Sequence, residues 1–328
     1  MRKKIAEVPL LFNLNFILVC IFSSVAIAQT YPGLPTRSQN PLLQSYFIPA
    51  IPITSAEKWS FSQSLYITNT YQLEHKQQEE LEIDVENSRL DFQATYNFKP
   101  WYFNINAPYI SNQSGHLDQT ISNWHNFFHL PNGGRDTVES DQLRLFYGHE
   151  GNTFFDIQQP AEGLADIQLA LGYQVDQSTQ AWFALEIPSS NASQLISNDA
   201  IDAAIWISNA AIPIASTSGY FTLGLAFPAN EGIFKGNLRS QFGFAQFGLN
   251  YAINHDYEVI FQTDFHTQML KTSDLEALTT SLQGQFVLRL NNLFKKHTVD
   301  LFFSEDIYPG HAPDITFGLR IAPSSNTN

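Results

Sequence analysis

The chain has 328 residues, a formal net charge of -14 at pH 7, 14% aromatic residues and only 15% charged residues. Such an acidic chain, with no basic patch or stripe, is not expected to bind nucleic acid. No stretch after the N-terminus approaches the ~18 consecutive apolar residues of a spanning helix. Together with the few charges and many aromatics, this favours a β-barrel in a membrane over a soluble helical protein.

The N-terminus has the pattern of a secretory signal peptide. A basic start at residues 2–4 precedes an apolar run, and Ala26 and Ala28 give the small-x-small pattern expected before a cleavage site. We expect residues 1–28 to be removed; the alternative is an uncleaved membrane anchor. Cys20, the only cysteine, lies in this segment, so the mature chain is expected to lack disulfides and thiolate chemistry.

Residues 29–56 are rich in proline and predict an extended N-terminal segment that is not a strand. Residues 57–328 are expected to form the barrel. Twelve segments there alternate apolar with polar or small residues, as strands with one apolar face do. They are 59–68, 90–97, 101–109, 167–175, 183–187, 201–207, 221–227, 247–251, 257–265, 282–290, 299–303 and 315–321. Phe242 and Phe244 are out of phase with their segment, which predicts a bulge near Ala245.

The connections between these segments alternate in length. Short links are expected at 98–100, 176–179, 210–217, 253–256 and 292–296, and longer ones at 71–80, 111–163, 189–197, 228–238, 269–276 and 305–311. Outer-membrane barrels show this alternation, with short periplasmic turns, longer outer loops and an even strand number. The fold class expected is therefore all-β: an antiparallel transmembrane β-barrel of about 12 strands, with a long, partly helical insertion loop.

Aromatic residues near the short turns predict an interfacial girdle on the periplasmic side. These residues are Trp59, Tyr96, Trp101, Tyr173, Tyr251 and Tyr257. In a soluble β-sandwich, the alternative fold, nothing would gather them at one end.

The polar face of the strands would line the lumen. It carries the acidic residues Asp91, Asp166, Glu186, Asp202, Glu258, Asp264, Asp300 and Asp314, and the basic or titratable residues Arg289, Arg320 and His266. One interpretation is a cation-favouring path or a polar ligand cavity. The other is a hydrogen-bonded network that fills a narrow lumen.

The insertion at 111–163 holds the densest group of reactive side chains. We expect a short helix around 121–128 and a small hairpin near 143–147 and 154–157. The candidate site residues are His116, Asp118, Trp124, His125, Arg135 and Asp136. His125 and His129 would share a helix face as half of a zinc site, but the segment is HNFFH and lacks the glutamate of H-E-x-x-H. The alternative is a packed loop, and no metal or cofactor is expected.

A serine hydrolase is a further alternative. The sequence has no G-x-S-x-G motif, and Ser189 and Ser190, after a strand end, belong to no recognisable triad. We therefore expect no enzymatic activity.

Three stretches resemble an uncharacterised family of Gram-negative proteins with barrel-like sequences, a domain of unknown function. They are LPTRSQNPLLQSYFIP, GHLDQTISNWHNFFHLPNGGR and GLADIQLALGYQV followed by LEIPSS. Residues of the second stretch match the family pattern at Leu117, Asp118, Trp124, His125, Leu130, Pro131, Gly133, Gly134 and Arg135, whereas His129 replaces a small residue. The resemblance implies a barrel in the envelope and no known activity.

The leading hypothesis is a cell outer-membrane barrel that acts as a plugged channel or structural envelope protein, in which residues 111–163 fold over or into the lumen as a plug. Its expected partners are outer-membrane lipids and lipopolysaccharide, and the barrel-assembly machinery during biogenesis. The alternatives are a barrel enzyme acting on lipids through residues 115–136, and a soluble periplasmic all-β binding protein.

Overall fold

The structure, a computed structural model, describes residues 33–34, 39–52, 54–55, 57–128, 139–189, 194–214, 217–291, 293, 297–307, 311, 313 and 315–324. Within helix α1 and strand β9 the side chains of residues 124, 125, 128, 211 and 213 are not described. The described residues contain no helix long and apolar enough to cross a membrane.

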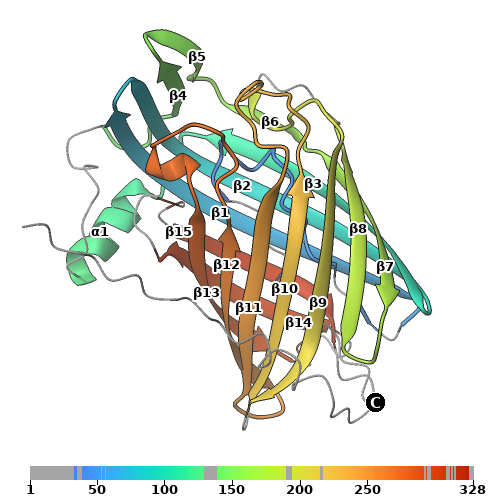
Figure 1. The fold of residues 1–328 in the computed structure, drawn as a ribbon. Helices are drawn as coiled ribbons and strands as arrows, with labels where there is room; N and C mark the ends of the chain where they lie inside the picture. Colours follow the sequence, from blue (N-terminus) through green and yellow to red (C-terminus); the bar gives the residue numbers. More distant parts are fainter. Residues whose placement is uncertain are drawn as a thin grey trace, which may run out of the picture.

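Twelve strands of the described chain close into an antiparallel β-barrel, as predicted (Figure 1). They are β1 (Trp59–Lys76), β2 (Glu79–Phe98), β3 (Trp101–Gln113), β7 (Ile167–Gln174), β8 (Thr179–Ile187), β9 (Asp202–Ile214), β10 (Thr217–Phe227), β11 (Phe242–Ala252), β12 (Tyr257–His266), β13 (Ser281–Leu290), β14 (His297–Asp306) and β15 (Ile315–Pro323). Each strand pairs with the next, and β15 closes the barrel on β1, from Gln63 opposite Ile321 to Asn69 opposite Ile315. Because the first and last strands of the barrel pair with each other, neither is left as an unpaired edge, as a membrane requires.

Two local predictions about the strands are wrong. The charged loop expected at 71–80 is strand, because β1 and β2 run on into a tight hairpin at Gln77, where φ is 53°. The expected bulge near Ala245 is absent, since β11 keeps one register with both neighbours. Phe242 and Phe244 face the lumen, which is apolar at the loop end. The register shift lies instead between Gly219 and Phe221 on β10.

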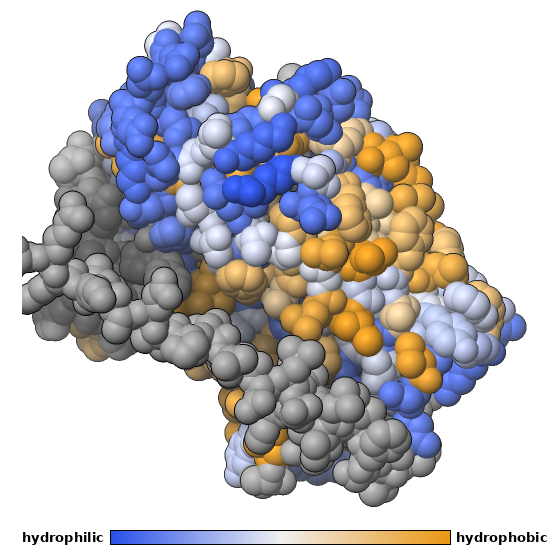
Figure 2. Space-filling model, viewed as in Figure 1, coloured by the Kyte–Doolittle hydropathy of each residue, from blue (hydrophilic) through white to orange (hydrophobic). Residues whose placement is uncertain are grey.

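The outer face of the wall is apolar. Along β3, Phe103 and Ile105 are 38% exposed, while Asn104 and Asn106, which alternate with them, are fully buried in the lumen. On the face seen in Figure 2, apolar side chains gather across the middle of the wall and hydrophilic ones cover its upper, loop end. Because the apolar side faces outward and the polar side inward, this barrel is the reverse of a soluble one, as a barrel surrounded by lipid requires.

The aromatic residues expected near the short turns lie together at that end of the barrel. Trp59 is opposite Tyr96, with ring centroids 4.6 Å apart, and Trp101 is opposite Tyr173, with centroids 4.9 Å apart. Tyr251 and Tyr257 flank the short β11–β12 turn and are exposed. The last strand, β15, also ends on this side, where Pro323 is opposite His297 at the start of β14.

The insertion forms a helix and small strands at the loop end. α1 (Asp118–Phe128) is followed by the hairpin of β4 (Arg144–His149) and β5 (Asn152–Ile157), which extends β2, and by β6 (Ala161–Leu164), which pairs with β3. In Figure 1, α1 lies beside the wall and away from the lumen. The start of α1 is fixed by two outward-facing residues: Asn69 donates to Asp118 (2.9 Å), and Glu86 accepts the backbone N–H groups of His116 and Leu117 (3.0 and 3.2 Å).

Candidate functional site

The lumen is filled by the N-terminal segment, here called the plug and defined as residues 33–34, 39–52 and 54–55. The sequence predicts that this segment is extended and that the 111–163 insertion folds over or into the lumen as a plug. That prediction is wrong for α1, which is held at the outer face of β1 and β2, whereas Leu145 and Tyr147 of β4 are buried in the core at the loop end. Every plug residue from 39 to 52 is buried instead.

Lumen-facing glutamines hold the plug backbone. Gln168 on β7 accepts the N–H of Ala50 (2.8 Å) through its carbonyl oxygen and donates to the C=O of the same residue (2.9 Å). Gln262 accepts the N–H of Leu34 (3.0 Å), and Gln246 donates to the C=O of Leu34 (2.9 Å). An extended segment inside a barrel has no strand beside it, so its buried backbone groups need side-chain partners. Primary amides suit this role because they both donate and accept.

Towards the short-turn end the plug continues along the wall. Ser55 accepts a hydrogen bond from Asn97 (2.9 Å), and Thr54 accepts one from Gln180 (3.1 Å). Both wall residues lie near the turns that carry the aromatic girdle. The plug therefore returns from the loop end to the short-turn end, where it joins β1.

At the loop end the plug packs in an apolar core. Leu42, Leu43, Tyr46 and Phe47 are at most 1% exposed. Tyr46 lies 5.9 Å from Phe234 between ring centroids, and its hydroxyl accepts the Phe234 N–H (3.0 Å). The loops after β10 and β12 and the β4 strand supply the other side of this core. The loop end is thus closed by apolar packing and the opposite half by polar contacts.

A short 3-10 helix, η5 (Glu276–Leu278), ties the plug to the protruding β1–β2 hairpin. Asn40 of the plug donates to the Ala277 C=O (2.8 Å), and Glu74 accepts the Ala277 N–H (3.0 Å). Lys76 forms an ion pair with Glu276 (2.6 Å). The hydrogen bond from Lys76 lowers the pKa of the Glu276 carboxyl, so this contact is ionic at neutral pH.

A network of paired charges runs through the lumen across β12 to β15. Asp300, fully buried, accepts from Arg289 (2.8 Å) and from Arg320, and Arg320 also donates to the Gly33 C=O of the plug (2.7 Å). Glu258 lies 3.8 Å from Arg289. Each guanidinium has a carboxylate partner, which offsets the cost of removing it from water.

The other predicted lumen acids also hold protein groups. Asp166 accepts the N–H groups of Ser189 (3.1 Å) and Asn198 (3.3 Å), and Asp202 accepts from Asn198 (2.7 Å) and from the Ala229 N–H (2.7 Å). Buried inside the barrel are Asp91, Asp166, Glu186, Asp202, His266, Asp300, Arg289 and Arg320, whereas Glu258 and Asp264 are half-buried. Asp314 lies outside the described residues.

Of the candidate residues in the insertion, Asp118 has a structural contact besides Asn69: it accepts the Asp141 N–H (2.7 Å). The side chains of Trp124 and His125, and all of His129, Arg135 and Asp136, lie outside what the structure describes. In the described part, no three His, Cys, Asp or Glu side chains are grouped as a metal site would need. The structure holds α1 at the outer wall, whereas Leu145 and Tyr147 of β4 join the apolar core at the loop end.

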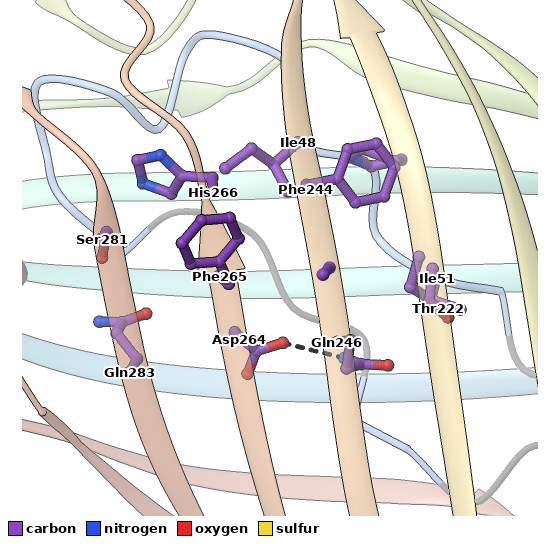
Figure 3. A pocket seen from close by; sticks show the side chains of 12 residues that line it. Ile48, Ile51, Thr222, Phe244, Gln246, Asp264, Phe265, His266, Ser281 and Gln283 are labelled. Carbon is purple, nitrogen blue, oxygen red and sulfur yellow. Dashed lines mark hydrogen bonds between the residues drawn. The ribbon is translucent and has the colours of Figure 1, made fainter. Parts of the chain in front are cut away.

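One small cavity lies between the plug and the wall formed by β10 to β13 (Figure 3). Ile48 and Ile51 of the plug and Phe244 form its apolar part, and Gln246, which donates to Asp264 (3.1 Å), belongs to its polar part. The buried imidazole of His266 also lines it. The sequence places Asp264 and His266 on the lumen face, but no pattern in it identifies the plug side chains that complete the cavity.

Four aromatic rings cross the lumen wall from near the short-turn end to this cavity. Tyr102 lies 5.9 Å from Trp182, Trp182 lies 5.8 Å from Trp206 with its ring nearly parallel, and Trp206 lies 6.4 Å from Phe244. Two of the glycines on the intervening strands, Gly172 and Gly224, leave room for these rings. The row gives a polar lumen one continuous apolar stripe.

A family of proteins described as "Protein of unknown function (DUF3187)" matches residues 10–322. No curated protein matches the chain. Among solved structures, the COG4313 outer membrane channel from Pseudomonas putida F1 is 9% identical, covers 82% of this chain and 96% of its own, and has a TM-score of 0.51.

Two further structures resemble the chain more weakly. The NanC porin is 10% identical over 82% of this chain and 100% of its own, with a TM-score of 0.42. The CymD monoaromatic hydrocarbon channel is 9% identical over 90% and 94%, with a TM-score of 0.42. At these identities the likeness concerns the fold alone. The chain belongs to the DUF3187 family of proteins of unknown function and has the fold of an outer-membrane β-barrel.

Proposed function

We propose that the protein is a non-enzymatic channel of the cell outer membrane that its N-terminal plug keeps closed. The observation that carries this proposal is the burial of residues 39–52 inside a closed barrel. A barrel that served only as a scaffold could fill its lumen with its own side chains. Here the lumen is instead occupied by a segment that precedes β1 and takes no part in the strand pairing of the barrel.

The surfaces support the location. The outward apolar belt with an aromatic girdle at one end suits outer-membrane lipids, and the hydrophilic loop end suits lipopolysaccharide. Delivery there would need the cleaved signal peptide at 1–28 and the barrel-assembly machinery. A soluble periplasmic protein would have to expose the same belt to water, which the hydrophobic effect opposes.

The lumen charges support a preference for cations once the plug is displaced. The carboxylates facing the lumen include Asp91, Asp166, Glu186, Asp202, Glu258, Asp264 and Asp300, and they outnumber the guanidinium groups of Arg89, Arg289 and Arg320. A ring of excess negative charge attracts cations into a pore. The aromatic stripe beside these charges offers a surface for the apolar part of a small solute.

The test is conductance in planar bilayers. The mature chain is expected to conduct little, and a variant lacking residues 29–55 is expected to give stable, cation-selective openings. The matched control replaces residues 115–135 with a short glycine-serine linker, which should leave the conductance low because α1 lies outside the lumen. Silence of a folded, heat-modifiable Δ29–55 barrel, or openings caused by the linker variant, would contradict the proposal.

The lipid-enzyme alternative has its own test. A lipid hydrolysis assay on the purified protein and on His125→Ala would detect activity from the insertion. We expect no activity in either protein.

A further inference from the structure

A second small cavity lies between the plug and the wall formed by β1 and β2. Gln39 and Gln44 of the plug line one side, and Arg89 and Asp91 of β2 line the other. These two glutamines and Arg89 are 8%, 3% and 6% exposed, so their polar groups have left water almost completely. The cavity is separate from that of Figure 3, which lies against β10 to β13.

The groups around this cavity have more donors than acceptors. Arg89 Nε donates to both carboxylate oxygens of Asp91 (3.0 and 3.1 Å). Arg89 Nη2 lies 3.0 Å from Asp91 Oδ1 but at an angle that makes no hydrogen bond, and among the described residues neither Nη1 nor Nη2 has a hydrogen-bond partner. Within the same part of the chain, the side-chain nitrogens of Gln39 and Gln44 also lack partners.

The remaining polar lining groups have partners of their own. Thr68 is bonded to Thr316 (2.8 Å), Asn87 donates to Asn112 (2.7 Å), and Tyr66 is hydrogen-bonded to Ser64. A guanidinium group can only donate, and leaving its protons unpaired in a buried site is costly. Water would bring two protons of its own to a cavity whose surplus groups are already donors. An anion brings only acceptors.

We propose that this cavity binds a small monovalent anion, of the size of formate or chloride, which bridges Arg89 on the wall to Gln39 and Gln44 on the plug. The charge is limited to one because Asp91 already pairs with Arg89. Since the bridge joins plug and wall, the bound anion stabilises the closed lumen. Binding itself does not depend on the proposed channel function, so it is measured without conductance.

The experiment follows thermal unfolding of the purified mature protein in detergent by tryptophan fluorescence. Sodium formate or sodium chloride replaces sodium gluconate at constant ionic strength, since gluconate is too large for the cavity. We expect the unfolding midpoint to rise with formate and with chloride and to reach a plateau. A midpoint that does not change, or that rises without saturation, overturns the proposal.

Variants locate the site. Gln44→Glu places a carboxylate in the cavity, so its midpoint in gluconate should exceed that of the wild type and should no longer respond to formate. Gln44→Leu removes one donor and should raise the formate concentration for half-saturation at least five-fold. Gln283→Leu, in the cavity of Figure 3, is the control and should respond as the wild type does.

An equal response of all variants would mean a general salt effect and would overturn the proposal. A crystal grown in bromide keeps the test independent of the variants' folding. We expect anomalous density beside Arg89 in the wild type; a bromide-free cavity in a crystal that binds bromide elsewhere contradicts the site.

Discussion

Gln168 is the residue on which the position of the plug most depends. It satisfies both backbone groups of Ala50 with its one amide, and it is itself fully buried. Gln93, Gln246 and Gln262 also bond backbone groups of the plug, and Gln180 bonds the Thr54 hydroxyl. A lumen lined by amides can thus hold an extended segment without a paired strand.

The change Gln168→Leu should loosen the plug. It leaves a buried N–H and a buried C=O without partners, at about 1–3 kcal/mol for each group. We expect the full-length variant to show frequent openings in planar bilayers and faster proteolysis near residue 50. Gln285→Leu is the matched control: this buried glutamine bonds to Asp264 and has no described bond to the plug. Equal behaviour of the two variants would show that Gln168 does not hold the plug.

At the scale of the elements, strand β11 shows how a wall strand and the plug depend on each other. Tyr220 of β10 lies over Gly248 of β11, where an added Cβ would come within 2.0 Å of the ring. The Tyr220 hydroxyl donates to Gln262 (2.7 Å), whose same oxygen accepts the Leu34 N–H. The absence of a side chain at Gly248 therefore positions a plug contact made by Gln262, the residue opposite it on β12.

Gly248→Ala should destabilise the barrel by about 1–3 kcal/mol, the usual cost of overpacking. Tyr220, buried on all sides, must move away from Gln262 to make room. Gly243→Ala on the same strand is the control, because its Cβ would have ordinary contact with Thr267 at 3.7 Å. The urea midpoint of folding in detergent should fall for Gly248→Ala alone.

At the scale of the whole molecule, the apolar surface and the polar interior give one orientation in a membrane. The exposed apolar side chains belong to the wall, and the strongly polar residues belong to the lumen or to the loop end. Lipid replaces water as the solvent of the outer face, so the usual rule of apolar core and polar surface is reversed over the barrel's middle.

Ile105→Arg should therefore prevent insertion. Ile105 is 38% exposed on the outer face of β3 and pairs with Leu169 at mid-strand. An arginine facing lipid near the bilayer midplane costs about 2–4 kcal/mol. Phe154→Arg is the control, since Phe154 is more exposed but lies on the β5 strand of the loop end. Membrane fractionation and heat-modifiable mobility on a gel should show loss of folded barrel for Ile105→Arg only.

The sequence by itself determined the barrel. Three local patterns indicated it: a period of two in twelve segments, alternating connection lengths, and aromatics near the short turns. Each pattern depends only on neighbouring residues and on which solvent meets each face of a strand. It also placed Asp264, Asp300 and Arg320 on the lumen side, because alternation assigns a side chain to a face.

Only the tertiary structure decided what fills the lumen. The plug has no period, and its contacts join residues as far apart as Gly33 and Arg320, so no local pattern could reveal them. The insertion carried the more notable side chains, yet outward-facing Asn69 and Glu86 hold its helix α1 outside the lumen. The signals that were present are apolar residues such as Leu42 and Phe47 in an otherwise irregular segment, and glutamines recurring on the lumen face. These residues can be interpreted only once the barrel is closed. A closed wall encloses the plug, and the buried backbone groups of the plug then need lumen side chains as hydrogen-bond partners.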